Sequence, residues 1–240
     1  MKITVINGTP VKGVTWNMKE RFLEQFQGAR DIKEFILPKD MPEFCVGCKN
    51  CFFKGEDRCP HTEYITPIWK AILEADLIVF AYPVYALRAP GSVKALLDHF
   101  CVHWMVHRPE KEMFSKNAVI LTNSVGAPNT AAQKDVITSL TWMGISKIRR
   151  LGIGLMEGVI WPELSEKRKA FIYKKVDALS RQCMNLKKER MSFKVKLYFA
   201  LCKKMHEAGL RNSKEAFLDD LHYLNNGWIK DRRNQNATNH

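Results

Sequence analysis

The sequence predicts an α/β fold in which one parallel β-sheet is covered by helices on both faces. Residues 77–81 and 118–121 are unbroken apolar runs, as expected of strands that are buried on both faces. These runs alternate with helical patterns, and that alternation is typical of βαβ units and a parallel sheet. The 240 residues are 46% hydrophobic and 26% charged, which suits a large globular core and rules out low-complexity disorder.

Each element is predicted from a local pattern. Short apolar and β-branched runs predict strands over residues 3–6, 32–37, 77–81, 118–121 and 148–155. The first run ends at a turn, Asn7-Gly8-Thr9-Pro10, and a helical pattern begins at Asn17. Further helices are predicted over residues 65–74, 93–100 and 132–143, with a loop over residues 123–129.

The pattern changes after Pro162 to helices without strands. These helices are predicted over residues 165–186, 192–207 and 215–224. The net charge of +13 also lies mainly here: residues 164–240 hold 18 Lys and Arg against 8 Asp and Glu, whereas residues 1–163 carry only +3. We therefore expect a domain over residues 1–163 and a basic helical C-terminal extension over residues 164–240, in which the lysines of surface helices are solvated. Binding to an anionic membrane or to nucleic acid is the alternative, and the lack of RNA-binding motifs argues against nucleic acid.

The expected cellular compartment decides how the cysteines are interpreted. No run approaches the ~20 apolar residues of a membrane span, and the first strand is too short for a signal peptide, so we expect a cytoplasmic protein without a transmembrane segment. Four of the seven cysteines fall within residues 45–59. In a cytoplasmic chain such a cluster indicates metal or redox chemistry more than disulfides.

The loop after the first predicted strand is suited to a phosphate. It joins a buried strand to the N-terminus of a helix, where free N–H groups favour an anion. The hydroxyls of Thr9 and Thr15 and the amide of Asn17 add hydrogen-bonding groups. The loop lacks both the P-loop and the three-glycine dinucleotide patterns, so it suits a monophosphate such as that of FMN. A plain strand–helix turn remains the alternative.

The loop after the third predicted strand is more specific. Pro83 and Pro90 stiffen it, and Tyr82 and Tyr85 offer flat apolar surfaces at its mouth. Backbone amides of such a loop can bond the polar edge of a flat heterocycle. Pro90 suits the first turn of the helix that follows.

At these two loops the sequence resembles the flavodoxin-like NAD(P)H-dependent FMN reductases. The resemblance is carried by Gly8-Thr9-Pro10, Pro83-Val84-Tyr85, Pro90, Lys94 and Asp98-His99, and it covers about residues 1–160. It implies a flavodoxin-like, doubly wound, five-stranded parallel sheet that binds FMN. It also implies that the FMN phosphate lies by Thr9, Pro10, Lys12, Thr15, Trp16 and Asn17. The isoalloxazine ring would then meet Pro83, Val84 and Tyr85 on one side and Asn123, Ser124, Val125 and Gly126 at its other edge.

The cysteine motif leaves three interpretations open. Cys45, Cys48 and Cys51 follow the C-x2-C-x2-C spacing of bacterial ferredoxins, and Cys59-Pro60 follows after a longer gap. This segment resembles the compact motif of iron–sulfur flavoproteins, a branch of the same family that holds a [4Fe-4S] cluster near FMN. Similar segments in other family members are metal-free and pack as a lid beside the flavin. Four thiolates also suit tetrahedral zinc.

The histidines invite a metal interpretation that their spacing does not favour. His99, His103 and His107 would share one helix face only if that helix continued, and no H-E-x-x-H pattern accompanies them. We therefore expect them, together with His61, to be polar residues near a helix end or at a subunit contact.

The resemblance implies an FMN-dependent oxidoreductase that passes electrons from NAD(P)H through FMN to an acceptor such as a quinone, a nitro or azo compound, or free flavin. The flavin carries the chemistry, so no side chain is named as catalytic. The alternative is an electron-transfer iron–sulfur flavoprotein with its cluster on Cys45, Cys48, Cys51 and Cys59. The resemblance also suggests a homodimer and a small-molecule or protein electron acceptor, with no nucleic-acid partner.

Overall fold

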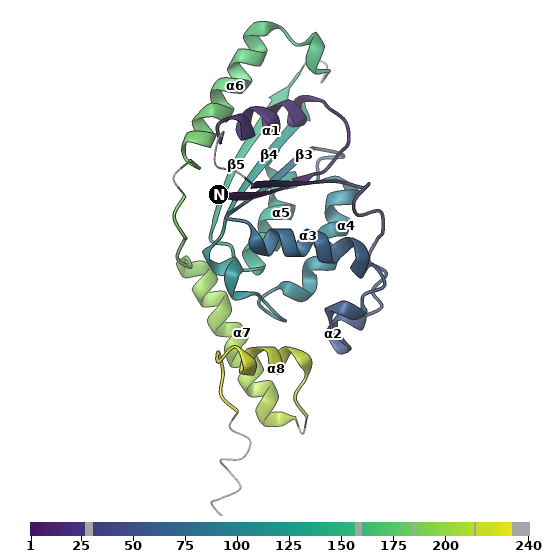
Figure 1. The fold of residues 1–240 in the computed structure, drawn as a ribbon, viewed down its shortest axis with the longest axis vertical. Helices are drawn as coiled ribbons and strands as arrows, with labels where there is room; N and C mark the ends of the chain where they lie inside the picture. The colour runs from purple at the N-terminus through teal and green to yellow at the C-terminus, as the bar shows by residue number, and fades with distance from the viewer. Residues whose placement is uncertain (27–30, 157–159, 185, 214, 232–240) are drawn as a thin grey trace, which may run out of the picture.

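The sheet has the strand order that the sequence resemblance implies. The computed structural model describes residues 1–26, 31–156, 160–184, 186–213 and 215–231 (Figure 1). In these residues five parallel strands pair in the order β2-β1-β3-β4-β5. They are β1 (Lys2–Asn7), β2 (Asp31–Ile36), β3 (Leu77–Pro83), β4 (Asn117–Val125) and β5 (Lys147–Leu155). The flavodoxin-like, doubly wound fold is therefore confirmed.

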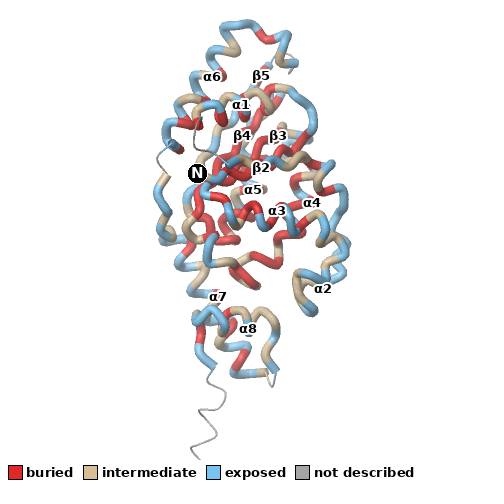
Figure 2. Tube along the Cα trace, viewed as in Figure 1, coloured by how far each residue is buried: buried red, intermediate tan, exposed pale blue. Residues whose placement is uncertain are grey.

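Helices cover both faces of this sheet. On one face lie α3 (Thr62–Glu74), α4 (Gly91–His99) and α5 (Thr130–Trp142), and on the other lie α1 (Val14–Glu24) and α6 (Glu166–Arg181) (Figure 1). The central strand β3 supplies both apolar clusters, because successive side chains of a strand point to opposite faces. Ile78 and Phe80 join the α3–α5 cluster, whereas Leu77 and Val79 join the α1–α6 cluster. Figure 2 shows the buried residues concentrated along the strands and the inner sides of these helices.

The strand β4 is longer than predicted, and α1 begins earlier. Residues 123–125, predicted as part of a loop, continue β4 because they pair with β5, with Asn123 opposite Ile153. The apolar pattern stops at Leu121, although Asn123 and Ser124 are buried. The helix α1 begins at Val14 rather than Asn17, directly after its N-cap Gly13.

The C-terminal helices divide into two groups. The helix α6 ends at Arg181, short of the predicted 186, and packs on α1, where Arg21 holds Asp177 through two hydrogen bonds of 2.8 Å. The helices α7 (Phe193–Asn212) and α8 (Leu218–Asn225) form a third apolar cluster with Met105, and they lie beyond the end of α5 in Figure 1. The division at residue 163 stays a prediction. Among the described residues, no helix is both long and apolar enough to cross a membrane.

Candidate functional site

The loop after β1 approaches its neighbours closely. A Cβ atom at Gly8 would lie 2.5 Å from the Cβ atom of Tyr82, so only glycine allows this contact with β3. The Oγ1 atom of Thr9 accepts a hydrogen bond from the Val11 amide over 3.2 Å. The Nδ2 atom of Asn17 donates to the Gly13 carbonyl over 2.8 Å, which closes the loop onto the first turn of α1. No side chain in the described part of the chain caps this helix N-terminus, so its first N–H groups are available to an anion.

Trp16 holds a buried cation rather than an open surface. The Nζ atom of Lys19 lies 3.7 Å from the centre of the Trp16 ring, and the side chain of Lys19 is 0% exposed. Glu34 on β2 lies 2.9 Å from the same ammonium and also accepts a hydrogen bond from Asn7. These contacts fix α1 against the first two strands. Lys12 is exposed, with its Nζ atom 5.4 Å from the Trp16 ring.

The loop after β3 contains a tight turn held from outside. Tyr85 and Arg88 exchange two backbone hydrogen bonds of 3.0 and 2.9 Å, and the residues between them, Ala86 and Leu87, have φ angles of 48° and 64°. This left-handed backbone is costly for residues other than glycine. Asp135 on α5 holds the turn by accepting hydrogen bonds from the Arg88 side chain and from the Ala89 amide. The contacts of Asp135 therefore hold a strained turn that fixes the position of Tyr85.

The end of β4 lies beside this loop. The Val84 amide donates to the Asn123 carbonyl over 2.8 Å. Ser124 is 2% exposed and accepts a hydrogen bond from Asn129 over 3.0 Å. Gly126 has a φ of 65°, and its amide bonds to the Leu155 carbonyl. The Nδ2 atom of Asn123 is buried and has no hydrogen-bond partner among the described residues, which leaves a donor unsatisfied at this edge.

A pocket of about 510 Å³ opens at the carboxyl edge of β1 and β3. Among the predicted flavin residues, Thr9, Pro10 and Tyr85 line it. The others lie near the same edge but outside its lining: Lys12, Thr15, Trp16, Asn17, Pro83, Val84, Asn123, Ser124, Val125 and Gly126. The sequence interpretation missed one wall, formed by Leu37, Pro38, Met41, Pro42 and Phe44 after β2, and the start of α4 at Gly91 and Ser92. The strand order would have indicated the wall after β2, because β2 lies next to β1 and its carboxyl end therefore borders the same pocket.

The four clustered cysteines line a second pocket, of about 320 Å³. Cys45 and Cys48 are exposed, and Cys51 and Cys59 are partly buried. Burial, with the neighbouring thiols acting in the same direction, raises the pKa of Cys51 to about 11. Burial also raises the pKa of Cys59. These thiols are therefore protonated at neutral pH unless a metal ion stabilises the thiolates.

Arg108 holds the cysteine segment, residues 45–59, in place through several hydrogen bonds. Its side chain is 5% exposed, and its Nε atom donates to Glu56 over 2.7 Å. The guanidinium also donates to the backbone carbonyls of Cys51 and Phe52 and to Asp219 of α8. It thereby joins the cysteine segment to the C-terminal helices.

The histidines separate into two groups because α4 ends at His99. His103 stacks on Trp69 at 3.9 Å, and its near-complete burial lowers its pKa to about 4. His107 bonds to Asp219 over 2.8 Å. His99 instead meets His61, with 2.9 Å between the His61 Nδ1 and His99 Nε2 atoms, and burial lowers the pKa of His99.

Known proteins resemble this chain in sequence or in fold. An iron-sulfur flavoprotein from Archaeoglobus fulgidus is 23% identical over 165 residues, which cover 68% of this chain and 73% of that protein. An iron-sulfur flavoprotein from Methanosarcina thermophila is 30% identical over 155 residues, covering 60% and 74%. The crystal structure of an FMN-dependent NADH-azoreductase from Bacillus anthracis in complex with FMN has a TM-score of 0.59 at 14% identity, covering 77% of this chain and all of that one. At this identity the last likeness shows the fold alone.

A model of a protein family also matches the sequence of this chain. The model described as NADPH-dependent FMN reductase matches residues 1–155. The matched segment holds all five strands, the loops after β1 and β3, and the four clustered cysteines. The chain therefore belongs to the NADPH-dependent FMN reductase family.

Proposed function

We propose that the protein is an FMN-dependent oxidoreductase that passes electrons from NAD(P)H through bound FMN to an acceptor such as a quinone, a nitro or azo compound, or free flavin. The observation that carries this proposal is the pocket at the carboxyl edge of β1 and β3, with Thr9 at one side and Tyr85 at its rim. Ligands of doubly wound sheets bind at this edge, where the direction of the strand order reverses. Family membership supports both the flavin and the nicotinamide donor.

The loop after β1 and the start of α1 would hold the phosphate. The uncapped N–H groups of the first helical turn favour an anion, and Thr9, Thr15 and Lys12 add two hydroxyls and a positive charge. Asn17 would act by closing the loop on Gly13. Trp16 would act by anchoring α1 through Lys19. Pro10 restricts the backbone beside Thr9.

The ring system would lie between the loops after β2, β3 and β4. FMN supplies hydride and electron transfer at its isoalloxazine ring. Pro83, Val84 and Tyr85 would present one wall, and Met41 after β2 an apolar counterpart. At the edge formed by residues 123–126, the unsatisfied Asn123 amide would donate to a ring carbonyl. These groups bind, orient and exclude water, and we propose no side chain as acid or base.

A homodimer and a cytoplasmic location complete the proposal. Phe193, Leu197, Leu201 and Met205 recur at every fourth position of α7 and are exposed, although side chains of this kind favour burial. All seven cysteines are free thiols, as is usual in a reducing compartment. Light scattering on the purified chain tests the dimer directly, and a monomer at micromolar concentration contradicts it.

Flavin titration with a steric probe tests the site. Gly91 lines the pocket, and an added Cβ atom there meets no other segment of the described chain within 4 Å, so the side chain of Gly91→Leu starts in open space beside the pocket. We expect the wild-type chain to quench the fluorescence of one FMN and Gly91→Leu to bind at least ~10-fold more weakly, a loss of about 1.4 kcal/mol.

The matched control for this probe is Lys70→Leu, which adds the same side chain to an exposed position of α3. It should bind FMN as tightly as the wild type. A wild-type chain that leaves FMN free, or a Gly91→Leu chain with wild-type affinity, contradicts the proposal.

A second candidate function is electron transfer through a [4Fe-4S] cluster on Cys45, Cys48, Cys51 and Cys59. The donor set fits, because four thiols border one pocket, and relatives are named iron-sulfur flavoproteins. Anaerobic analysis of iron and sulfide tests it: about four of each per chain support a cluster, and their absence from an anaerobic preparation rejects it.

A further inference from the structure

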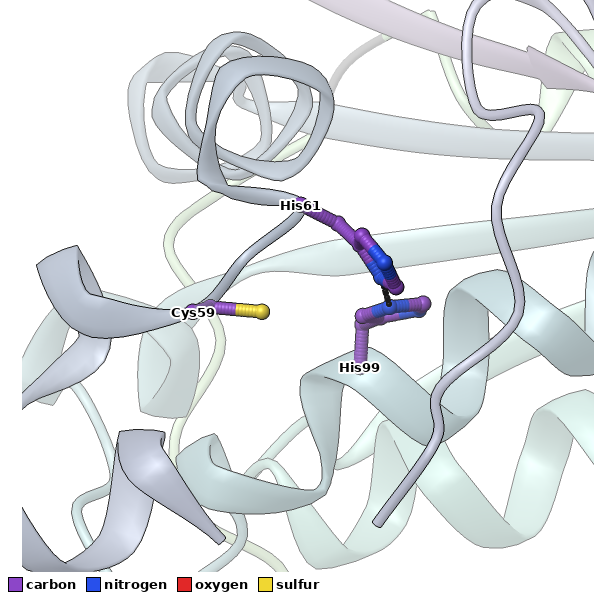
Figure 3. A group of neighbouring side chains, drawn as sticks. All are labelled: Cys59, His61 and His99. Carbon is purple, nitrogen blue, oxygen red and sulfur yellow. Dashed lines mark hydrogen bonds between the residues drawn. The ribbon is translucent and has the colours of Figure 1, made fainter. Parts of the chain in front are cut away.

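Cys59, His61 and His99 bring three metal-binding atoms together. Cys59 follows the 3-10 turn Glu56–Arg58, His61 is the N-cap of α3, and His99 is the last residue of α4. One ligand atom from each lies within 4.8 Å of the other two. Figure 3 shows the sulfur of Cys59 pointing toward the two imidazole rings.

His99 is already oriented as a ligand by its second ring nitrogen. Its Nδ1 atom lies 2.8 Å from the Ala95 carbonyl, and a carbonyl only accepts, so Nδ1 carries the proton. The lone pair of neutral His99 is then on Nε2, the atom that faces His61. A backbone carbonyl that fixes the tautomer in this way is the usual second partner of metal-binding histidines.

We propose that Cys59, His61 and His99 bind a single divalent ion of borderline softness, with Zn²⁺ as the best match. One thiolate and two imidazoles are ligand types that zinc takes in tetrahedral sites, with Zn–N distances of ~2.0–2.1 Å and Zn–S of ~2.3 Å. Tetrahedral geometry at these lengths sets the two nitrogens about 3.4 Å apart. The observed 2.9 Å therefore opens by about half an ångström as the ion replaces the hydrogen bond.

The ion would keep one open position toward the cysteine pocket. Cys59 and His99 both line that pocket, so a water molecule or a further ligand can reach the fourth position. Binding displaces the proton of the Cys59 thiol to solvent, and the proton that His61 Nδ1 donates to His99 Nε2 moves to the Nε2 atom of His61, which frees Nδ1 for the ion. Ala95, which fixes His99, also lines the larger pocket, so the ion would lie about one turn of α4 from that pocket.

This site is different from the four-cysteine set. It uses neither Cys45 nor Cys48, and it adds two histidines that the set does not contain. Because Cys59 belongs to both, a chain holds either the cluster or the single ion at one time. The two assignments therefore predict opposite effects of the same substitutions.

Cobalt substitution separates them. The full-length chain, treated anaerobically with a chelator and a thiol reductant, is titrated with Co²⁺ alone. We expect one Co²⁺ per chain, with the intense visible bands of a tetrahedral ion and a sulfur-to-cobalt charge-transfer band, and displacement by one equivalent of Zn²⁺. X-ray absorption of the zinc form should show one sulfur and two nitrogen ligands from the protein.

Two sets of variants decide the ligands. His61→Ala, at a partly buried position, should weaken Co²⁺ binding by more than ~100-fold, about 2.7 kcal/mol, and His99→Gln should do the same. The matched control, Cys45→Ser with Cys48→Ser, should keep the full affinity and the same spectrum. Circular dichroism verifies that each variant is folded. Failure of the wild-type chain to bind one Co²⁺, or binding that survives His61→Ala and is lost in the Cys45/Cys48 double variant, overturns the proposal.

Discussion

Arg108 donates a hydrogen bond from its Nη1 atom to Asp219 of α8, so one buried guanidinium connects the sheet domain to the last helix of the chain. The same side chain donates to Glu56 and to the carbonyl of Cys51. The position of the cysteine segment therefore depends on Arg108 and, through it, on Asp219, which lies 111 positions further along the chain.

Arg108→Ala should lower the free energy of unfolding by about 2 kcal/mol, because it leaves the partly exposed carboxylates of Glu56 and Asp219 and the carbonyl of Cys51 without their donor. Urea unfolding measures the change. Arg150→Ala, which removes an exposed arginine from β5, is the control and should cost less than about 0.5 kcal/mol. Equal losses in the two variants would refute the structural role of Arg108.

The pH dependence of stability should reveal His107. Burial acts to lower its pKa, but the hydrogen bonds and charges of Asp219 and Cys101 together outweigh burial and raise the pKa to about 9. The folded state thus holds a proton that the unfolded chain, with a histidine pKa near ~6.5, releases. The resulting stabilisation is complete below about pH 6.5 and is lost as the pH rises toward 9. Wild-type and His107→Gln melting temperatures should therefore converge between these values, whereas a constant difference would exclude this protonation.

The turn between Tyr85 and Arg88 should be open to stabilisation. Leu87 has a φ of 64° and a side chain that is 59% exposed, so its backbone costs energy without burying the leucine. Leu87→Asn should raise the free energy of unfolding by about 0.5–1 kcal/mol, because asparagine tolerates left-handed backbone. Leu221→Asn, at an exposed position in the helix α8, should instead lower it slightly. Denaturant titration compares the two, and a loss of stability in Leu87→Asn would argue against backbone strain.

Removing the buried cation of Lys19 should cost less stability than removing its partner Glu34. Glu34→Gln should lower the free energy of unfolding by about 2 kcal/mol, since among the described residues the Lys19 ammonium then keeps Glu20 as its one charged partner. Lys19→Met should cost less than about 1 kcal/mol, because an apolar chain of similar shape needs no partner. Adding Lys19→Met to Glu34→Gln should restore stability. Calorimetry of the three variants checks the order, and a larger loss in Lys19→Met than in Glu34→Gln would contradict it.

Much of the fold could be predicted because its signals are local. The runs at residues 77–81 and 118–121 predict buried strands by their composition, and both strands form where expected. The extension of β4 to Val125 could not be predicted in this way. Asn123 and Ser124 are polar, and they are buried only because β5 pairs beside them.

The candidate flavin site also has parts that could be predicted from local sequence and parts that could not. The loops after β1 and β3 could be identified from their residues, and Thr9, Pro10 and Tyr85 line the pocket they border. The wall at Met41 and Phe44 has no chemical signature of its own. It belongs to the pocket because β2 lies next to β1, which is a property of the strand order.

The sequence by itself determined the parallel sheet, the two loops at its carboxyl edge and the cluster of four cysteines, because each depends on consecutive or regularly spaced residues. Only the tertiary structure decided that His61 meets His99 and that Arg108 meets Asp219. These pairs join residues that are far apart along the chain, and their contact depends on where α3, α4 and α8 pack. Packing of this kind is set by the shapes of whole buried faces, which local sequence patterns do not encode.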